Sequence, residues 1–265
     1  MSYDFVSWDK GKTERIQTQF LKQALGCNFQ TSNNMARADT NTRPLINTII
    51  KRYLWYTIPL QTKKSEISYD AYIFELENYT QPNFCSFTEN FNLLVTEWVG
   101  KSKHEINKSC NDNYDRYWTN RISESTKAIS FARFKTRTSF EPHLAVNFNV
   151  NHKKAISRFR LSNHPLMIEK GRHLKIERNE RKCPFCKDDI EDEKHFLINC
   201  PLYSKERKTI EKVYINNCAR YANFDPEQKF IFLITNKNID IIKTIGKFIY
   251  DSLNFRNRLI EYFFS

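Results

Sequence analysis

Four potential metal ligands lie within eighteen residues of this sequence and constrain its fold more than any other feature. Cys183, Cys186, His195 and Cys200 follow the spacing C-x2-C-x8-H-x4-C. Three thiolates and one imidazole form the closed set of four ligands that structural Zn²⁺ prefers. A closed set leaves no coordination position for a reacting water, so we predict a zinc ion that stabilises the fold and has no catalytic role.

The residues between these ligands favour the same geometry. Pro184 fixes φ within the C-P-F-C turn and lowers the entropy of the turn before it binds a metal. Residues 193–198 can form one helical turn. We expect this turn to end at Cys200, because Pro201 disfavours α geometry in the residue before it.

Other interpretations of this stretch remain. The cysteines and the histidine could be ordinary core residues, although such spacings are typical of metal sites. His173 is a rival for His195, but it lies ten residues before Cys183 and would need a longer flexible span. We expect Asp188 and Asp189 to form a solvated acidic loop, since nothing around them resembles the strands that position a catalytic pair.

Composition favours a globular, mainly α-helical fold. The chain has 265 residues, of which 40% are hydrophobic, so it can bury a sizeable core. It contains only 5 Gly and 8 Pro, few for a chain of tight hairpins. The longest apolar run, residues 230–234, is far shorter than the roughly 18 residues of a membrane span, and the N-terminus does not resemble a signal peptide. We therefore expect an intracellular protein without a membrane-spanning helix.

Hydrophobic periodicity and capping residues predict helical segments around the metal-binding stretch. The longest is an amphipathic helix over 239–263, capped by Asn238, whose apolar stripe needs a packing partner. Asp225 and Pro226 predict the start of a helix over 227–234. For residues 127–135 the pattern fits a helix or a strand. The other predicted helices cover residues 13–25, 44–56, 66–77, 88–99, 111–122, 155–161 and 201–213.

This pattern suggests four segments. Residues 1–62 and 63–150 are helical, residues 151–217 form the basic metal-binding module, and residues 218–265 form the C-terminal helices. The polar run at 61–65 is the main candidate for a boundary, and residues 101–108 form another polar connector.

Positive charge is concentrated beside the metal-binding stretch. The net charge of the chain is +12; residues 153–182 contain ten Lys and Arg against three Glu, and residues 127–137 add four cations without an acid. This concentration is typical of proteins that bind a polyanion, although a solvated charged face is the alternative. Phe159 and Phe185 could stack on bases or belong to the core. The cations that we expect to contact phosphates are Arg158, Arg160, Arg172, Arg178, Arg181 and Lys182.

Several stretches of the chain resemble a known family. The most specific are R-F-R-L-S-N-H-P-L-M-I-E-K-G-R-H (158–173), E-R-K-C-P-F-C (180–186) and H-F-L-I-N-C-P-L-Y (195–203). Upstream, S-Y-D-F-V-S-W (2–8) and E-R-I-Q-T-Q-F-L-K-Q-A-L-G (14–26) extend the similarity. Together they resemble the C-terminal region of non-LTR (LINE-type), jockey-like retrotransposon reverse transcriptases, which comprises the part after the polymerase palm and a zinc-binding module.

The resemblance implies a nuclear protein that grips template RNA or target DNA for an RNA-directed DNA polymerase. The chain lacks the adjacent palm carboxylates that hold two Mg²⁺ ions, so we predict no catalytic residue and no enzyme activity of its own. Residues 38–42 (A-D-T-N-T) depart from the Gly-Glu-Leu-Gly-Arg type of sequence usual in this family. Two alternatives remain: a nuclease-associated tail, and a scaffold that binds a protein partner through the helix over 239–263.

Overall fold

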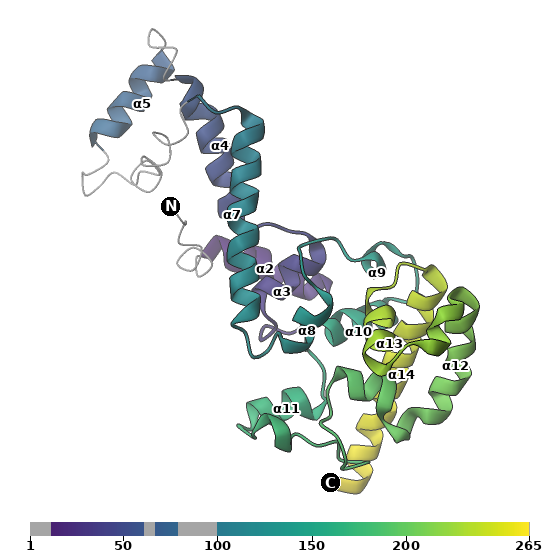
Figure 1. The fold of residues 1–265 in the computed structure, drawn as a ribbon. Coiled ribbons are helices and arrows are strands. Elements are labelled where there is room, and N and C mark those ends of the chain that lie inside the picture. Colours follow the sequence, from purple (N-terminus) through teal and green to yellow (C-terminus); the bar gives the residue numbers. More distant parts are fainter. Residues whose placement is uncertain (1–11, 61–66, 79–99, 265) are drawn as a thin grey trace. The chain divides into compact units, whose positions relative to one another are not determined.

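The structure is a computed structural model that describes residues 12–60, 67–78 and 100–264. This part of the chain is mainly helical and contains no β-strand, as predicted (Figure 1). Its single β-bridge joins Lys182 to Ile190. No helix within these ranges is both long enough and apolar enough to cross a membrane.

The helices follow the sequence pattern closely. The α-helices are α2 (Lys12–Ala24), α3 (Asn33–Thr40), α4 (Leu45–Leu60), α5 (Ile67–Asn78), α7 (Lys103–Ser123), α8 (Ile129–Phe134), α9 (Pro142–Ala145), α10 (Val150–Arg160), α11 (Met167–His173), α12 (Ser204–Asn217), α13 (Pro226–Thr235) and α14 (Ile239–Phe264). Short 3₁₀ or π turns are η1 (Arg178–Glu180), η2 (His195–Asn199), η3 (Pro201–Tyr203) and η4 (Ala219–Asn223).

Most of the predicted helices are confirmed. The ambiguous residues 127–135 form helix α8, and the predicted helix over 111–122 is the second half of the longer α7. The predicted helix over 88–99 and the predicted boundary at 61–65 lie outside the described residues.

The chain forms two compact units, which we describe separately. Unit 1 comprises residues 1–17 and 43–118, and unit 2 comprises residues 18–42 and 119–265. This division differs from the four consecutive segments suggested by the sequence, because residues 18–42 belong with the C-terminal half of the chain.

Unit 1 contains the pair of helices α4 and α7. Side chains at four-residue intervals are buried on each helix, including Ile50 and Leu54 on α4 and Tyr114 on α7. The Asn47 amide on α4 donates a hydrogen bond of 2.9 Å to the carbonyl of Cys110 on α7. This buried contact fixes the register of the two helices.

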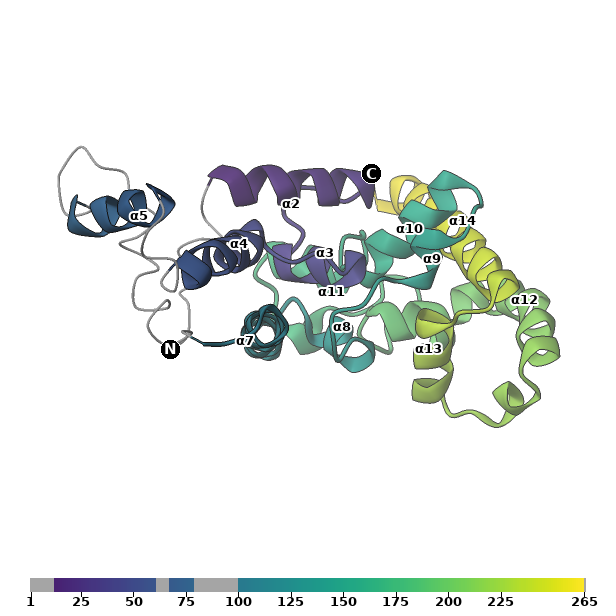
Figure 2. The ribbon, with the colours of Figure 1, turned by 90° about the horizontal axis from the view of Figure 1, so that it is seen from above.

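Unit 2 is built around α14, which packs beside α10 (Figure 2). The apolar stripe predicted on α14 enters the core from Ile241 to Ile249, and α10 contributes Ile156 and α13 contributes Phe230. Gly246 allows the close approach of α10, because a Cβ at this position would lie 3.1 Å from Ile156 Cδ1. The first half of the stripe therefore finds its packing partner within the chain.

Local sequence starts the last two helices as predicted. Asp225 caps α13 in a capping box with Gln228, and each side chain accepts a hydrogen bond from the backbone N–H of the other residue. Asn238 Oδ1 accepts from the backbone N–H groups of Asp240 and Ile241 at the start of α14. These caps satisfy N–H groups that have no partner within their helix.

Candidate metal centre

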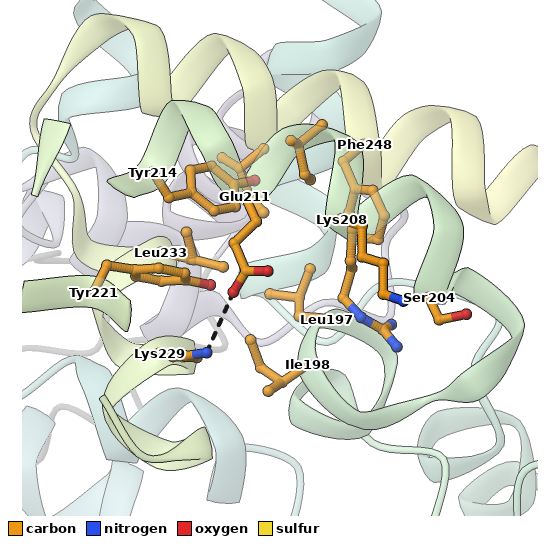
Figure 3. Close-up of a pocket in the computed structure, with 13 residues that line it drawn as sticks. Leu197, Ile198, Ser204, Lys208, Glu211, Tyr214, Tyr221, Lys229, Leu233 and Phe248 are labelled. Atoms are coloured by element: carbon orange, nitrogen blue, oxygen red, sulfur yellow. Dashed lines mark hydrogen bonds and ion pairs between the residues drawn. The ribbon is translucent and has the colours of Figure 1, made fainter. Parts of the chain in front are cut away.

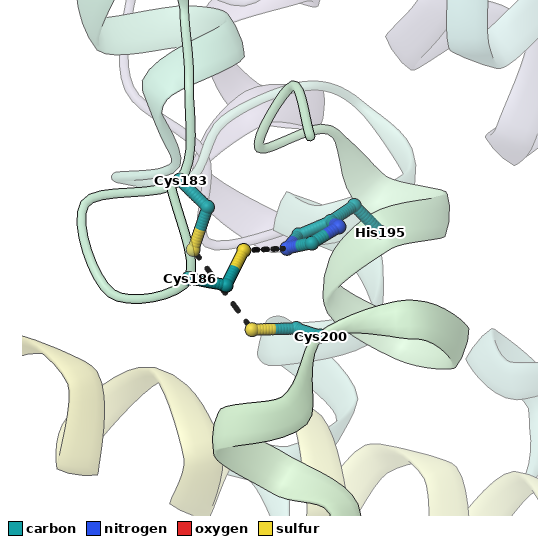
Figure 4. A group of neighbouring side chains, drawn as sticks. All are labelled: Cys183, Cys186, His195 and Cys200. Carbon is teal, nitrogen blue, oxygen red and sulfur yellow. Dashed lines mark hydrogen bonds between the residues drawn. The ribbon is translucent and has the colours of Figure 1, made fainter. Parts of the chain in front are cut away.

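The four predicted ligands come together in unit 2 and form a cluster that could bind a metal ion (Figure 4). The ligand atoms of Cys183, Cys186, His195 and Cys200 all lie within 4.8 Å of one another. Three of these residues are buried and Cys186 is half-buried. We refer to these four residues as the metal cluster, and to residues 183–200 as the metal loop.

Backbone hydrogen bonds position the first two ligands. The N–H of Cys183 donates to the carbonyl of Asp189 at 2.9 Å, and the N–H of Lys187 donates to the carbonyl of Cys183 at 2.9 Å. Lys187 adopts a left-handed conformation with φ of 62°, which reverses the chain after Cys186. The resulting turn points both sulfur atoms to the same side.

A π-helical turn positions the other two ligands. Residues His195–Asn199 form η2, and the N–H of Cys200 donates to the carbonyl of His195 at 2.7 Å. Asp192 starts this turn, since its carboxylate accepts a hydrogen bond of 2.8 Å from the N–H of His195. The predicted turn before Pro201 is confirmed, but it is π-helical, and the i to i+5 spacing brings His195 and Cys200 onto the same side.

Hydrogen-bond contacts couple the four potential ligands in pairs. The sulfur atoms of Cys183 and Cys200 lie 3.9 Å apart. This contact, together with burial, raises the pKa of Cys183 to about 12, and the same contact lowers the pKa of Cys200. Because a metal binds the thiolates, we expect metal binding to displace protons from this cluster.

His195 faces an acidic neighbour as well as the thiols. Its Nε2 lies 3.4 Å from the sulfur of Cys186, and its Nδ1 lies 3.5 Å from a carboxylate oxygen of Asp189. Burial lowers the pKa of His195, but Cys183 and these two neighbours outweigh burial and raise the pKa overall. His195 Nδ1 forms no hydrogen bond, so Asp189 acts on the ring through its charge. Asp188 and Asp189 are exposed, as predicted for the acidic loop.

Glu191 anchors the metal loop to two helices. Its buried carboxylate forms two hydrogen bonds, of 2.7 and 2.6 Å, with the guanidinium of Arg256 on α14. It also accepts a hydrogen bond of 2.7 Å from the N–H of Met167 at the start of α11. No local signal in the sequence reveals this pair, because Glu191 and Arg256 are 65 residues apart.

Glu193 forms a second buried anchor. Its carboxylate accepts hydrogen bonds from Ser130 Oγ at 2.5 Å and Ser162 Oγ at 3.1 Å, and it lies 3.0 Å from His164 Nε2. Burial raises the pKa of Glu193, but the hydrogen bonds from His164 and Ser130 outweigh it and lower the pKa to about 2. The carboxylate therefore joins the metal loop to α8 and to the turn after α10.

The predicted phosphate-contacting cations have different environments. Arg158 and Lys182 are exposed, and Arg172 and Arg178 are half-buried. Arg181 is half-buried and donates to the backbone carbonyls of two residues, Ile176 at 2.9 Å and Ile168 at 3.0 Å. Its guanidinium therefore has a structural role in the α11 segment.

The prediction that Arg160 contacts phosphate is wrong. Its side chain is fully buried and pairs with Asp39 through two hydrogen bonds of 2.7 and 3.0 Å. It also lies 2.9 Å from Glu141, which in turn pairs with Lys135. We call Asp39, Lys135, Glu141 and Arg160 the charge cluster. These two acids satisfy Arg160, which has no route to a ligand in solvent.

The remaining candidates fall outside the metal cluster. His173 is exposed and is not one of the four clustered residues. Phe159 is buried in the core of unit 2, so it is not available to stack on a base, whereas Phe185 is half-buried against the same core.

A cavity of about 190 Å³ lies beside the metal loop, between α12, α13 and α14 (Figure 3). Three of the charged groups that line it are engaged: Lys229 Nζ lies 3.3 Å from Glu211, and Arg207 donates to the carbonyls of Phe196 and Cys200. Its inner wall is apolar and includes Leu197, Leu233 and Phe248.

Comparisons with family models, with curated proteins and with solved structures found no match. The geometry of the site is therefore the basis for its interpretation. Within the described residues, the metal cluster is the one group of at least three Cys, His, Asp or Glu side chains placed to hold a metal ion. A closed set of this kind can stabilise a loop, and it offers no position for a substrate.

Proposed function

We propose that unit 2 is a zinc-stabilised nucleic-acid-binding module of the kind found in the C-terminal part of retrotransposon-type reverse transcriptases. The observation that carries the proposal is the closed metal cluster with exposed cations on the segments around it. In this proposal the metal holds the metal loop against α11 and α14, and binding of RNA or DNA is the activity of the chain.

Two of the distances within the metal cluster, whose ligand atoms lie up to 4.8 Å apart, are close to those of a tetrahedral zinc site. With Zn–S near 2.3 Å and Zn–N near 2.0–2.1 Å, a tetrahedral ion separates two sulfurs by about 3.8 Å and a sulfur from a nitrogen by about 3.6 Å. The corresponding distances are 3.9 Å between Cys183 and Cys200 and 3.4 Å between Cys186 and His195. Thiolate-rich sets of four also select zinc over the hard cations Mg²⁺ and Ca²⁺.

Exposed cations around the metal loop support binding to phosphates. Lys170 and Lys175 are exposed on the α11 segment, and Lys182 and Lys187 are exposed on either side of the first two ligands. None of these four forms an ion pair with a described residue, so their charge is available to a polyanion. Contacts of this type position a strand without reading its sequence.

A protein-binding scaffold is the second candidate, because the end of α14 is exposed. The side chains of Tyr262 and Phe263 are 79% and 63% exposed. The first half of the apolar stripe packs in the core of unit 2, and Phe255 in the second half is 37% exposed, so the second half of α14 is the part left for a protein partner.

The salt dependence of binding tests the proposal. We expect wild-type protein to bind labelled RNA or DNA with an affinity that falls steeply as salt increases. The double variant Lys170→Ala/Lys182→Ala should reduce the log–log slope by up to about two units, since each lost phosphate contact removes about 0.7–0.9. The measurement is fluorescence polarisation across a salt series.

The matched control is Lys243→Ala/Lys247→Ala, which removes two exposed cations from α14. This variant should change the slope much less. Binding that is insensitive to salt, or equal effects of the two double variants, would favour the scaffold.

A further inference from the structure

A polar cleft lies between α10, the turn at residues 163–165 and α14, away from the ligands of the metal cluster. Its volume is about 250 Å³. One face of each helix lines it, since its residues recur at intervals of three and four: Asn151, Lys154 and Arg158 on α10, and Tyr250, Asn254 and Asn257 on α14. The floor is apolar and is formed by Ala155 and Leu253.

The cleft offers amide groups that have no partner. Asn151, Asn254 and Asn257 form no side-chain hydrogen bond with any described residue, and each amide carries a donor and an acceptor. None of the described residues that line the cleft is acidic, while Lys154 and Arg158 are cationic. Asn254 and Asn257 also line a neighbouring, more open hollow, to which α14 contributes the acids Asp251 and Glu261.

His164 is one of the residues that line the cleft. Its side chain is fully buried, and its Nε2 is engaged by the carboxylate of Glu193 at 3.0 Å. Its Nδ1 is also buried and has no hydrogen-bond partner. Because a buried polar atom without a partner is costly, a ligand or water in the cleft that reaches this atom would be stabilised.

Gly26 contacts both cationic side chains of the cleft, Lys154 and Arg158. Its φ of +71° directs its carbonyl to Arg158 Nε, which donates a hydrogen bond to it. The stem of Lys154 passes over the same residue, where a Cβ would lie 2.7 Å from Lys154 Cγ. The absence of a side chain at Gly26 therefore allows two cations to converge beside the unpaired amides.

We propose that this cleft binds one unpaired nucleotide of the bound strand. The edge of the base forms hydrogen bonds with the amides of Asn151, Asn254 and Asn257. A phosphate contacts Lys154 and Arg158. Amide side chains match the donors and acceptors of base edges, and those edges are fully accessible only in single-stranded segments. The volume of about 250 Å³ is below the roughly 300–1,000 Å³ of drug-sized sites, which suits a single base. This inference rests on the proposed nucleic-acid-binding function.

The test compares a single strand with a duplex. The probes are a fluorescein-labelled single strand of about 15 nucleotides, in RNA and DNA form, and the corresponding duplex. We expect Asn254→Ala/Asn257→Ala to weaken single-strand binding about tenfold, duplex binding less than about twofold, and to leave the salt slope unchanged, because an amide carries no charge. The RNA and DNA arms show which sugar the cleft prefers.

Two further variants complete the test. Asn216→Ala removes an exposed amide from α12 and should leave both affinities unchanged. Lys154→Ala should weaken both probes and lower the salt slope by about one unit, since it removes one phosphate contact. Metal content and thermal unfolding show that each variant is folded.

The inference is overturned if Asn254→Ala/Asn257→Ala leaves single-strand affinity unchanged, or if it weakens single strand and duplex alike. These results differ from a failure of the proposed function. If the proposed function itself were wrong, the wild-type protein would bind neither the single strand nor the duplex in a salt-dependent way.

Discussion

The metal cluster and the charge cluster are both polar sites buried in unit 2, but they are built in different ways. The metal cluster takes all its ligands from residues 183–200. The charge cluster pairs Arg160 with Asp39, which is 121 residues away. One site closes a short loop, and the other joins distant parts of the chain.

The difference shows two ways of burying polar groups. A metal ion bound to the metal cluster would contribute folding free energy to a short loop. Ion pairs without a metal must offset the cost of removing each charge from water, and they do so only when every group is satisfied. Arg160 meets this condition with Asp39, Glu141 and the carbonyl of Ile234, which it contacts at 2.6 Å.

The largest expected effect comes from breaking the metal cluster. Cys200→Ser should abolish metal binding and unfold the metal loop, because a structural zinc contributes about 10 kcal/mol or more of folding free energy. Elemental analysis measures the metal, and amide hydrogen exchange measures the protection of residues 183–200. We expect one zinc ion per wild-type chain.

The control for this prediction is His173→Ala, which should retain the metal because His173 is exposed and outside the cluster. The ligand assignment would be wrong if His173→Ala lost the metal while His195→Ala kept it.

A smaller effect is expected from breaking the charge cluster. Arg160→Met leaves two buried acids, Asp39 and Glu141, beside one remaining cation of the cluster, Lys135. One negative charge is then uncompensated, so we expect a loss of about 3–5 kcal/mol in the free energy of unfolding. This loss measures the cost of uncompensated charge, not the strength of the pair. Urea unfolding followed by circular dichroism provides the measurement.

An exposed ion pair serves as the matched control. Lys247 and Asp251 on α14 lie 2.6 Å apart, with side chains that are 67% and 53% exposed. Lys247→Met should change stability by less than about 1 kcal/mol. Equal losses for Arg160→Met and Lys247→Met would contradict the structural role of the charge cluster.

The smallest expected effect is a pH dependence beside the charge cluster. Burial, together with the charge of Arg160, lowers the pKa of His143 from 6.5 to about 3, and its Nε2 lies 2.9 Å from Ser157 Oγ. Because the pKa of His143 is lower in the folded protein, protonation of His143 favours the unfolded chain. The free energy of unfolding is therefore highest with respect to His143 above pH 6.5, and it declines as the pH falls from 6.5 towards 3. The decline should be about 1.4 kcal/mol per pH unit.

His143→Gln removes this titration while keeping a polar side chain. Unfolding free energies measured between pH 7.5 and pH 5 should therefore fall less steeply for the variant than for the wild type. Loss of metal in acid affects both proteins equally, so the difference between the two profiles isolates His143. Parallel profiles would show that His143 does not contribute.

The two clusters also differ in what the sequence reveals. The metal cluster could be predicted because its four ligands are close together in the chain and have a recognised spacing. The burial of Arg160 could not be predicted, because a count of cations over residues 153–182 does not include acids from other parts of the chain, such as Asp39 and Glu141. Lys127 illustrates the same error, because residues 127–137 contain no acid and yet Lys127 lies 3.8 Å from Glu169.

Helix positions were predicted well where capping and periodicity coincide. The C-terminal helix was predicted over 239–263 and spans Ile239–Phe264. The start of α7 was missed because residues 101–108 are polar. A local signal was present, since Ser102 and Glu105 form reciprocal hydrogen bonds of the capping-box type.

The discontinuity of unit 2 has a consequence for the kinetics of folding. Asp39 and Arg160 can pair only after a loop of about 120 residues has closed, and proteins rich in such distant contacts fold slowly. Within that loop, α4 and α7 form their own contact through Asn47 and Cys110. Early pairing of these helices shortens the effective loop and lowers the entropy lost on closure. Unit 1 should therefore accelerate the folding of unit 2, and substitutions that separate α4 from α7 should slow the closure around Arg160.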